Sequence, residues 1–222
     1  MRKILVVAPH ADDETLGCGG ALLKFKKEKN KLFWLLVTTM APESGYGAAQ
    51  INKRAQEIKR VATAYGFQKT FQLRFPASKL DVTPLAELAS AMGHVVREVR
   101  PEVVLVPFLG DAHTDHQITF KAMASCFKWF RYPSIKKVLA YETLSETDQA
   151  VPKKGTSFVP QVFVDITPYL TSKVRIMKIY KSEVGKFPFP RSTKAIKALA
   201  SVRGAACGSQ AAEAFMLIKE IF

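Results

Sequence analysis

One short polar cluster, residues 10–14, directly follows the first apolar run of the chain. Its sequence is His-Ala-Asp-Asp-Glu, so one imidazole and three carboxylates fall within five positions, a combination that the packing of a strand end does not require. Carboxylates this close together repel one another unless a cation or a hydrogen-bond network offsets the repulsion. A divalent metal ion is the simplest explanation of the cluster.

A second polar cluster, His113-Thr114-Asp115-His116, follows another apolar run, so three of the four histidines of the chain fall in these two clusters. His10, Asp13 and His116 would together supply two imidazoles and one carboxylate. This is a common set of ligands for catalytic zinc, and it leaves a position open for water or substrate. Iron(II) accepts the same ligands, so both metals stay open at this point.

The remaining residues of the clusters suggest acid–base chemistry. Asp12 is the candidate general base, because a carboxylate beside a metal site can take a proton from a water molecule whose pKa the metal has lowered towards about 7. Its alternative role is to cap the helix expected to begin near residue 15. His113 could donate to an oxyanion or protonate a leaving amine. Asp115 could orient the His113 imidazole, or could instead support the metal ligands from behind or cap a helix.

Alternating strand and helix patterns predict how the two clusters meet. The strands expected in the first half are Lys3–Ala8, Lys31–Thr39, 67–73 and 103–106, and the helices between them are 15–29, 51–65 and 83–100. Near-continuous apolar strands indicate a parallel sheet buried on both faces. We predict a single α/β domain over residues 1–222: a Rossmann-like, doubly wound, mostly parallel sheet flanked by helices. With strand order 3-2-1-4-5, ligands bind beside the first and fourth strands, which carry the two clusters.

The second half of the chain is less regular. The expected elements are a helix at 117–130, a strand at 136–141, a loop at 142–160 marked by Pro152, Gly155 and Pro160, a strand at 161–166, a helix after Pro168 that breaks at 187–190, and a helix at 193–203. Residues 212–222 are expected to form a tail.

The net charge of +14 is concentrated in one stretch, where residues 173–203 hold nine Lys or Arg against the single acid Glu183. Such a run is either a solvated helical face or a surface that attracts an anionic substrate or membrane. Nucleic acid is not expected as a partner, since no nucleic-acid-binding signature accompanies the charge. The three widely spaced cysteines, and the absence of a secretory leader or a span of about 18 apolar residues, predict a cytoplasmic protein. Peripheral membrane contact and homo-oligomer formation stay open.

The two clusters match motifs of a known family. Pro9-His10-Ala11-Asp12-Asp13-Glu14 resembles the Pro-His-Pro-Asp-Asp-Glu signature of the PIG-L/LmbE-like zinc-dependent N-acetylglucosaminyl deacetylases, and residues 113–116 resemble their His-x-Asp-His motif. The resemblance implies removal of the N-acetyl group from N-acetylglucosamine-type conjugates. It also implies His10, Asp13 and His116 as zinc ligands, Asp12 as base and His113 as oxyanion or acid partner. Arg54 resembles the family arginine that contacts substrate.

Two departures from the family pattern bear on the substrate. Ala11 replaces the second proline of the first motif, which predicts a looser loop with unchanged chemistry. Tyr180 and Glu183 stand where family members often have His and Gln, in a segment expected to shape the sugar pocket. The glycines at 17, 19 and 20 lack the spacing of a dinucleotide fingerprint and are better explained by close helix packing.

Our hypothesis is a metal-dependent N-deacetylase that acts on an N-acetylated amino sugar, carried on a phosphate- or lipid-linked group or built into a surface glycan. One alternative is a metallohydrolase of the same fold that cleaves a different amide. The other is a non-catalytic module with a structural metal, which binds an anionic partner through its basic surface.

Overall fold

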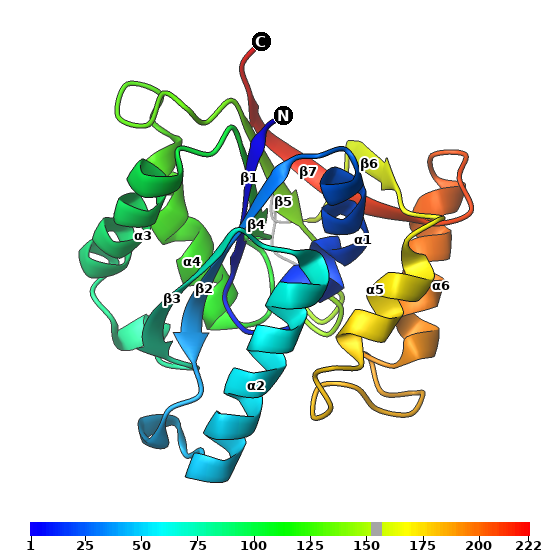
Figure 1. Ribbon diagram of the computed structural model, residues 1–222, viewed down its shortest axis with the longest axis horizontal. Coiled ribbons are helices and arrows are strands. Elements are labelled where there is room, and N and C mark those ends of the chain that lie inside the picture. Colours follow the sequence, from blue (N-terminus) through cyan, green and yellow to red (C-terminus); the bar gives the residue numbers. More distant parts are fainter. Residues whose placement is uncertain (152–156) are drawn as a thin grey trace.

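Seven strands form one sheet in the computed structural model, which describes residues 1–151 and 157–222 (Figure 1). The strands are β1 (Lys3–Ala8), β2 (Lys31–Thr39), β3 (Lys69–Pro76), β4 (Val103–Pro107), β5 (Lys137–Tyr141), β6 (Val162–Asp165) and β7 (Ala212–Glu220). The helices are α1 (Asp13–Lys27), α2 (Ala48–Tyr65), α3 (Leu85–Val99), α4 (Thr114–Ala124), α5 (Leu170–Met177) and α6 (Thr193–Ala205). Short 3-10 segments are η1 (Pro42–Ser44), η2 (Leu80–Val82) and η3 (Ser125–Phe127).

The strand order is β3-β2-β1-β4-β5-β7-β6, and the first five of these strands run parallel. This confirms the predicted order 3-2-1-4-5 and the mostly parallel sheet. β1 lies between β2 and β4, with Val6 paired to Trp34 on one side and to Leu105 on the other. The order of the strands reverses at β1 and β4, so the loops that follow these two strands lie side by side at the same edge of the sheet.

Helices cover both faces of the sheet (Figure 1). Side chains alternate along a strand, so Leu5 and Val7 of β1 pack under α3 and α4, while Ile4, Val6 and Ala8 pack under α1, α2, α5 and α6. Because both of their faces are buried, β1, β2, β4 and β5 are mostly apolar, whereas the edge strand β3 is only partly buried and contains several polar residues. The apolar runs of the sequence therefore predicted the positions of β1, β2, β4 and β5 closely.

The glycines of α1 allow the helix to lie directly against the sheet. A Cβ atom on Gly17 would lie 2.2 Å from the ring of Tyr141 in β5, and one on Gly20 would lie 2.6 Å from the side chain of Ile166. The Tyr141 hydroxyl in turn donates to the carbonyl of Val7 in β1 at 2.8 Å. The interpretation of these glycines as packing residues is confirmed.

A kink at Cys18 (φ −144°, ψ 20°) interrupts α1 and is stabilised by a buried ion pair. The backbone N–H groups of Gly20 and Ala21 donate to the Glu213 carboxylate at 2.8 and 2.7 Å. Lys173 donates to the same carboxylate at 2.7 Å and to the carbonyl of Leu16, also at 2.7 Å. These charge-assisted bonds connect α1, α5 and β7.

Three expectations for the second half of the chain were wrong. The expected tail at 212–222 forms β7, which lies between β5 and β6 and runs antiparallel to both. The helix expected at 117–130 begins at Thr114 and gives way to the 3-10 segment η3, and the helix after Pro168 ends at Met177, well before residue 187. Pro152 and Gly155 of the expected loop lie outside the described residues.

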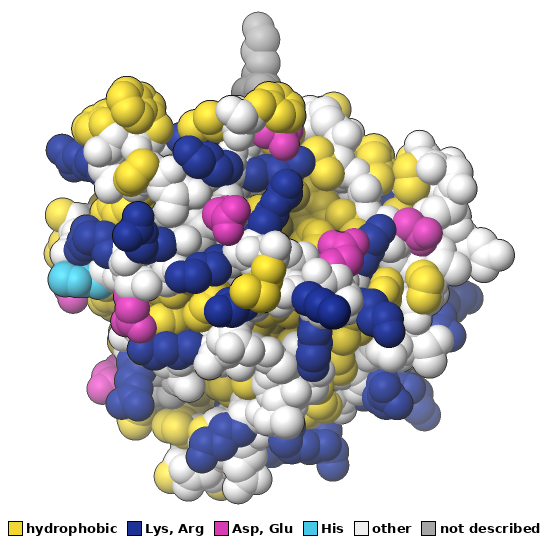
Figure 2. Space-filling view, turned by 45° about the horizontal axis from the view of Figure 1, so that its top comes forward, with side chains coloured by type: hydrophobic (Ala, Val, Ile, Leu, Met, Phe, Trp, Pro, Cys, Tyr) yellow, Lys and Arg dark blue, Asp and Glu magenta, His cyan; other side chains and the backbone are white. Residues whose placement is uncertain are grey.

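Positive side chains are scattered over the face of the molecule drawn in Figure 2. Figure 2 shows Lys and Arg distributed across the face in view, with far fewer Asp and Glu between them, rather than gathered in one stripe. None of the helices in the described part of the chain combines the length and the apolar character that crossing a membrane would need.

Candidate active site and metal centre

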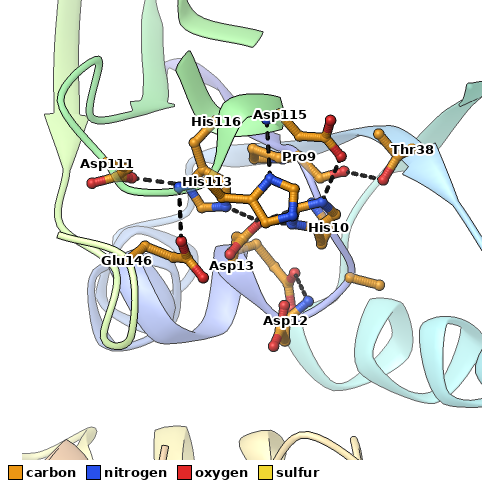
Figure 3. A network of polar contacts seen from close by, with 12 residues as sticks. Pro9, His10, Asp12, Asp13, Thr38, Asp111, His113, Asp115, His116 and Glu146 are labelled. Carbon is orange, nitrogen blue, oxygen red and sulfur yellow. Dashed lines mark hydrogen bonds and ion pairs between the residues drawn. The ribbon is translucent and has the colours of Figure 1, made fainter. Parts of the chain in front are cut away.

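The two polar clusters meet where β1 and β4 end beside each other. His10 and Asp12 lie in the turn between β1 and α1, and Asp13 is the first residue of α1. His113 is the N-cap of α4 and His116 lies in the first turn of that helix. The imidazoles of His10, His113 and His116 form one group in Figure 3, with Asp13 beside them.

The Asp13 carboxylate lies between His10 and His116, the two histidines predicted to bind the metal with it. Its Oδ2 atom lies 3.5 Å from Nδ1 of His10 and 3.3 Å from Nε2 of His116. One potential ligand atom from each residue lies within 4.8 Å of the other two, so the three side chains could hold one ion. The backbone N–H of His10 also donates to Oδ2 at 2.8 Å and fixes the carboxylate.

Each of these histidines has a buried aspartate on its other ring nitrogen. Nε2 of His10 lies 2.9 Å from Oδ2 of Asp115, and Nδ1 of His116 lies 2.8 Å from Oδ2 of Asp111. Such carboxylates set the tautomer and orientation of an imidazole and increase its basicity toward a metal. Asp111 was not predicted as a site residue, although its place five residues before His116 was a usable signal.

Two overlapping groups of side chains could hold a metal ion, and the group His10, Asp13 and His116 fits one better than the group His10, His113 and Asp115. His10, His113 and Asp115 are also close enough to share an ion, but the Asp115 carboxylate is already bonded to His10 and to the N–H groups of Ser78 and Leu80. In contrast, Nε2 of His116 is buried and has no hydrogen-bond partner in the described ranges, although Oδ2 of Asp13 lies 3.3 Å away. A buried nitrogen without a partner is costly, and a cation held with Asp13 and His10 would satisfy it.

The charges around this group favour a cation. Burial lowers the pKa of His10, but its bonds to Asp115 and Asp13 outweigh burial and raise it to about 9. Burial also lowers the pKa of His116, yet the Asp13 and Asp111 carboxylates bring it well above its ordinary value. For Asp13, burial raises the pKa, while the two imidazoles hold it well below the usual range.

Asp12 lines the pocket and makes no capping bond. It occupies the N-cap position of α1, but its side chain forms no hydrogen bond to the helix, and its φ of 156° is rare for a residue other than glycine. Burial raises the pKa of this carboxyl well above its ordinary value, and the charge of Asp13 adds to the effect. The Arg191 guanidinium lies 4.0 Å away, measured from Nε to Oδ2.

The backbone of Asp115, rather than its carboxylate, orients His113. The Asp115 N–H donates to Nδ1 of His113 at 3.0 Å, so the neutral ring carries its proton on Nε2. Burial, with the nearby charge of His10, lowers the pKa of His113 and favours the neutral ring. The backbone N–H of His113 donates to Oε2 of Glu146 at 3.1 Å, and Glu146 also lines the pocket.

A cavity of about 180 Å³ opens over the two clusters. Its wall includes Arg54, Glu146, Glu183 and Arg191, which come from α2, the loop after β5 and the segment between α5 and α6. Glu146 and Arg191 were not predicted from the sequence, and they lie in segments without a motif that could have marked them.

Arg54 lines this cavity with its guanidinium largely bonded to protein. Nη1 donates to the Ala11 carbonyl at 2.9 Å, Nε to Glu57 at 3.1 Å, and Nη2 to Ser182 at 2.9 Å and to Glu183. The turn at Ala11 is therefore held by Arg54 even without the second proline of the family motif. A direct substrate contact by Arg54 stays a prediction.

Comparison with known proteins identifies the family. A profile described as GlcNAc-PI de-N-acetylase, or PIG-L, matches residues 5–127, which is more than half of the chain and includes both clusters. The chain belongs to this family. As a PIG-L family member it is an amide-bond hydrolase of the deacetylase type. The family is metal-dependent, in keeping with the His/Asp group of the structure.

Individual relatives resemble this PIG-L member over most of its length. The uncharacterized deacetylase YaiS of Escherichia coli is 28% identical, and the match covers 82% of this chain and 91% of YaiS. The diacetylchitobiose deacetylase of Thermococcus kodakarensis is 26% identical, with 100% and 85% covered.

Solved structures confirm the fold. A conserved protein from Thermus thermophilus aligns with a TM-score of 0.80 at 24% identity, covering 100% of this chain and 97% of that one. The 4-carboxy-2-hydroxymuconate hydratase GalB of Pseudomonas putida aligns at 0.74 with 17% identity, covering 100% and 98%. Because GalB is a hydratase, the fold by itself does not fix the reaction.

Proposed function

We propose that this PIG-L family member hydrolyses the acetamide of an N-acetylated amino sugar of the N-acetylglucosamine type. The family description and the diacetylchitobiose deacetylase among its relatives support this substrate class. His10, Asp13 and His116 would hold the metal, for which we expect zinc, with iron(II) as the alternative. When bound, a divalent cation at this position polarises a carbonyl and lowers the pKa of water.

The other side chains supply the proton transfers. Asp12 would accept a proton from the attacking water, and the proton would then pass to the leaving nitrogen, so that acetate and a free amine form. His113 would donate from Nε2 to the oxygen on which negative charge develops, since its Nδ1 is occupied by the Asp115 N–H. Glu146 and the backbone of Asp115 position His113 for this role.

The environment of His116 Nε2 supports this function most strongly. The buried Nε2 of His116 has no hydrogen-bond partner in the described residues and lies 3.3 Å from Oδ2 of Asp13, which lines the same cavity as His10, Asp12 and His113. A purely structural metal would not need a neutral histidine and an aspartate that caps no helix, both directed into an open cavity. This arrangement favours a catalytic site over a non-catalytic module.

The experiment that separates the deacetylase from another amide hydrolase is a substrate panel. Acetate release is measured with N-acetylglucosamine, N,N′-diacetylchitobiose and an N-acetyl-lysine peptide on metal-loaded protein. The proposal predicts release from the sugars only. Release from the peptide alone would assign the site to another amide.

The basic stretch at residues 173–203 contributes to the proposal as a separate surface. Three of its nine cations are bonded to internal carboxylates: Lys173 to Glu213, Arg191 to Glu183 and Arg203 to Glu142. The other six are exposed, and we refer to them together as the basic face: Arg175, Lys178, Lys181, Lys186, Lys194 and Lys197. We propose that the basic face attracts an anionic carrier of the substrate, such as a phosphate- or lipid-linked group at a membrane surface. Cytoplasmic location and homo-oligomer formation stay predictions.

A further inference from the structure

A second cavity of about 230 Å³, which we call the outer recess, adjoins the metal-site cavity. Its wall is formed by the loop after β2, the first turns of α2 and the segment after α5, through Met40, Tyr46, Gln50, Lys53, Ser182 and Glu183. Met40, Tyr46, Arg54 and Glu183 line both cavities. A ligand in the metal-site cavity could therefore extend past these shared residues into the outer recess.

In the wall shared by the two cavities, most of the hydrogen-bond donors of Arg54 are already bonded to protein. Arg54 is buried, and four of the five guanidinium N–H groups bond to protein: to Ala11, Glu57, Ser182 and Glu183. Its Cζ atom lies 5.4 Å from the ring centre of the buried Tyr180. Tyr180 and Glu183 are two of the three positions at which the sequence departs from the family motifs, and Ala11 is the third. Glu183 lines the outer recess directly, and Tyr180 supports its wall from the core through the contact with Arg54.

The chemistry of the lining selects one class of ligand. Lys53 and Arg54 are balanced by the carboxylates of Glu57 and Glu183, so the recess has no excess charge to attract a phosphate. Gln50, Ser182 and the charged groups make it unsuited to an acyl chain. Tyr46 offers an aromatic face together with a hydroxyl, a combination suited to a sugar ring, which has apolar C–H faces and polar edges.

We propose that the outer recess binds a neutral, sugar-sized group attached to the acetamido sugar, so that the substrate is a disaccharide or a longer glycan. The inference rests on the proposed function, because it assumes that the acetamido sugar occupies the metal-site cavity. Tyr46 is then a specificity-determining residue, since it lines both cavities and would contact both sugar rings.

The test compares kcat/KM for N-acetylglucosamine, N,N′-diacetylchitobiose and N-acetylglucosamine 1-phosphate. The wild type should use the disaccharide at least tenfold better than either monosaccharide. In Lys53→Trp a bulky ring fills the recess, and the preference should fall towards one. Lys59→Trp places the same residue on an exposed position of α2 that lines neither cavity, and should keep the preference. Tyr46→Ala should lower the preference, and Tyr46→Phe should retain most of it.

Three results would overturn the proposal: equal use of the monosaccharide and the disaccharide, a stronger preference for the phosphate, or a preference that Lys53→Trp leaves unchanged. Calorimetric binding of the same sugars to metal-loaded Asp12→Asn gives a readout that does not depend on hydrolysis. If no acetate is released but this variant binds the disaccharide tenfold tighter than the monosaccharide, and Lys53→Trp removes the difference, the recess is supported and the proposed reaction fails. Equal binding would contradict the recess itself.

Discussion

Nδ1 of His116 lies 2.8 Å from Oδ2 of Asp111, and both side chains are completely buried. The other oxygen of Asp111 accepts the Thr147 hydroxyl at 2.6 Å. Asp111 therefore fixes the ring of His116 so that Nε2 points towards Asp13. Asp115 holds Nε2 of His10 in the same way at 2.9 Å.

Asp111→Asn should weaken metal binding by roughly tenfold to a hundredfold, because the imidazole loses the carboxylate that increases its basicity. Competition with a chromophoric chelator measures this affinity. Asp81→Asn, at an exposed position of η2, is the matched control and should bind metal like the wild type. An unchanged affinity in Asp111→Asn would show that this carboxylate does not support the metal site.

Asp12→Asn should lower kcat by roughly a hundredfold to ten-thousandfold, since the amide has the shape of the carboxylate and cannot accept the proton. Metal content should stay at the wild-type level, because Asp12 is not among the grouped ligand residues. Acetate release and metal analysis on the same sample check both points. A variant that keeps full activity would remove Asp12 from the mechanism.

Lys173→Met should lower the free energy of unfolding by about 3–5 kcal/mol, because it leaves the buried Glu213 carboxylate without its cation. Lys178→Met, exposed on the same segment, should change it by less than about 0.5 kcal/mol. Denaturant unfolding gives both values. If Lys173→Met unfolds like the control, the ion pair does not stabilise the kink of α1. The double variant with Glu213→Gln should lose less than Lys173→Met loses alone.

Lys186→Glu/Lys194→Glu should reduce binding to vesicles that contain phosphatidylglycerol, by about 1 kcal/mol for each cation removed from the surface. Lys128→Glu/Arg131→Glu carries the same change of charge outside the basic face and should bind like the wild type. Co-sedimentation at two salt concentrations measures the effect, which should weaken with salt. Equal losses in the two variants would mean that net charge alone, rather than the basic face, governs binding.

Most of the sheet and the pairing of the two clusters could be predicted, because both depend on local patterns. The central parallel strands are mostly apolar, and the loops that follow β1 and β4 lead into the two polar clusters. The strand β7 was missed although residues 214–218 form a continuous apolar run, because its antiparallel position between β5 and β6 departs from the parallel alternation of strand and helix on which the prediction rested. The pairing of β7 with β5 and β6 depends on tertiary packing, which no local sequence pattern marks.

Within the site, the side chains of the two motifs were predictable, and their surroundings were not. The start of α4 was placed three residues late because the N-terminus of this helix is capped by an imidazole, through the bond from Asp115 N–H to His113. Glu146 and Arg191 reach the cavity from segments far along the chain. Only the fold brings these residues to the site, so no local signal marks them.

The most direct test of the metal-dependent deacetylase is to measure metal content and acetate release on one preparation, before and after chelation. The structure predicts one divalent ion per chain at the group formed by His10, Asp13 and His116. Acetate release from an N-acetylglucosamine conjugate should stop when the ion is removed and return when zinc or iron(II) is restored. Full acetate release from metal-free protein would contradict the account at its centre.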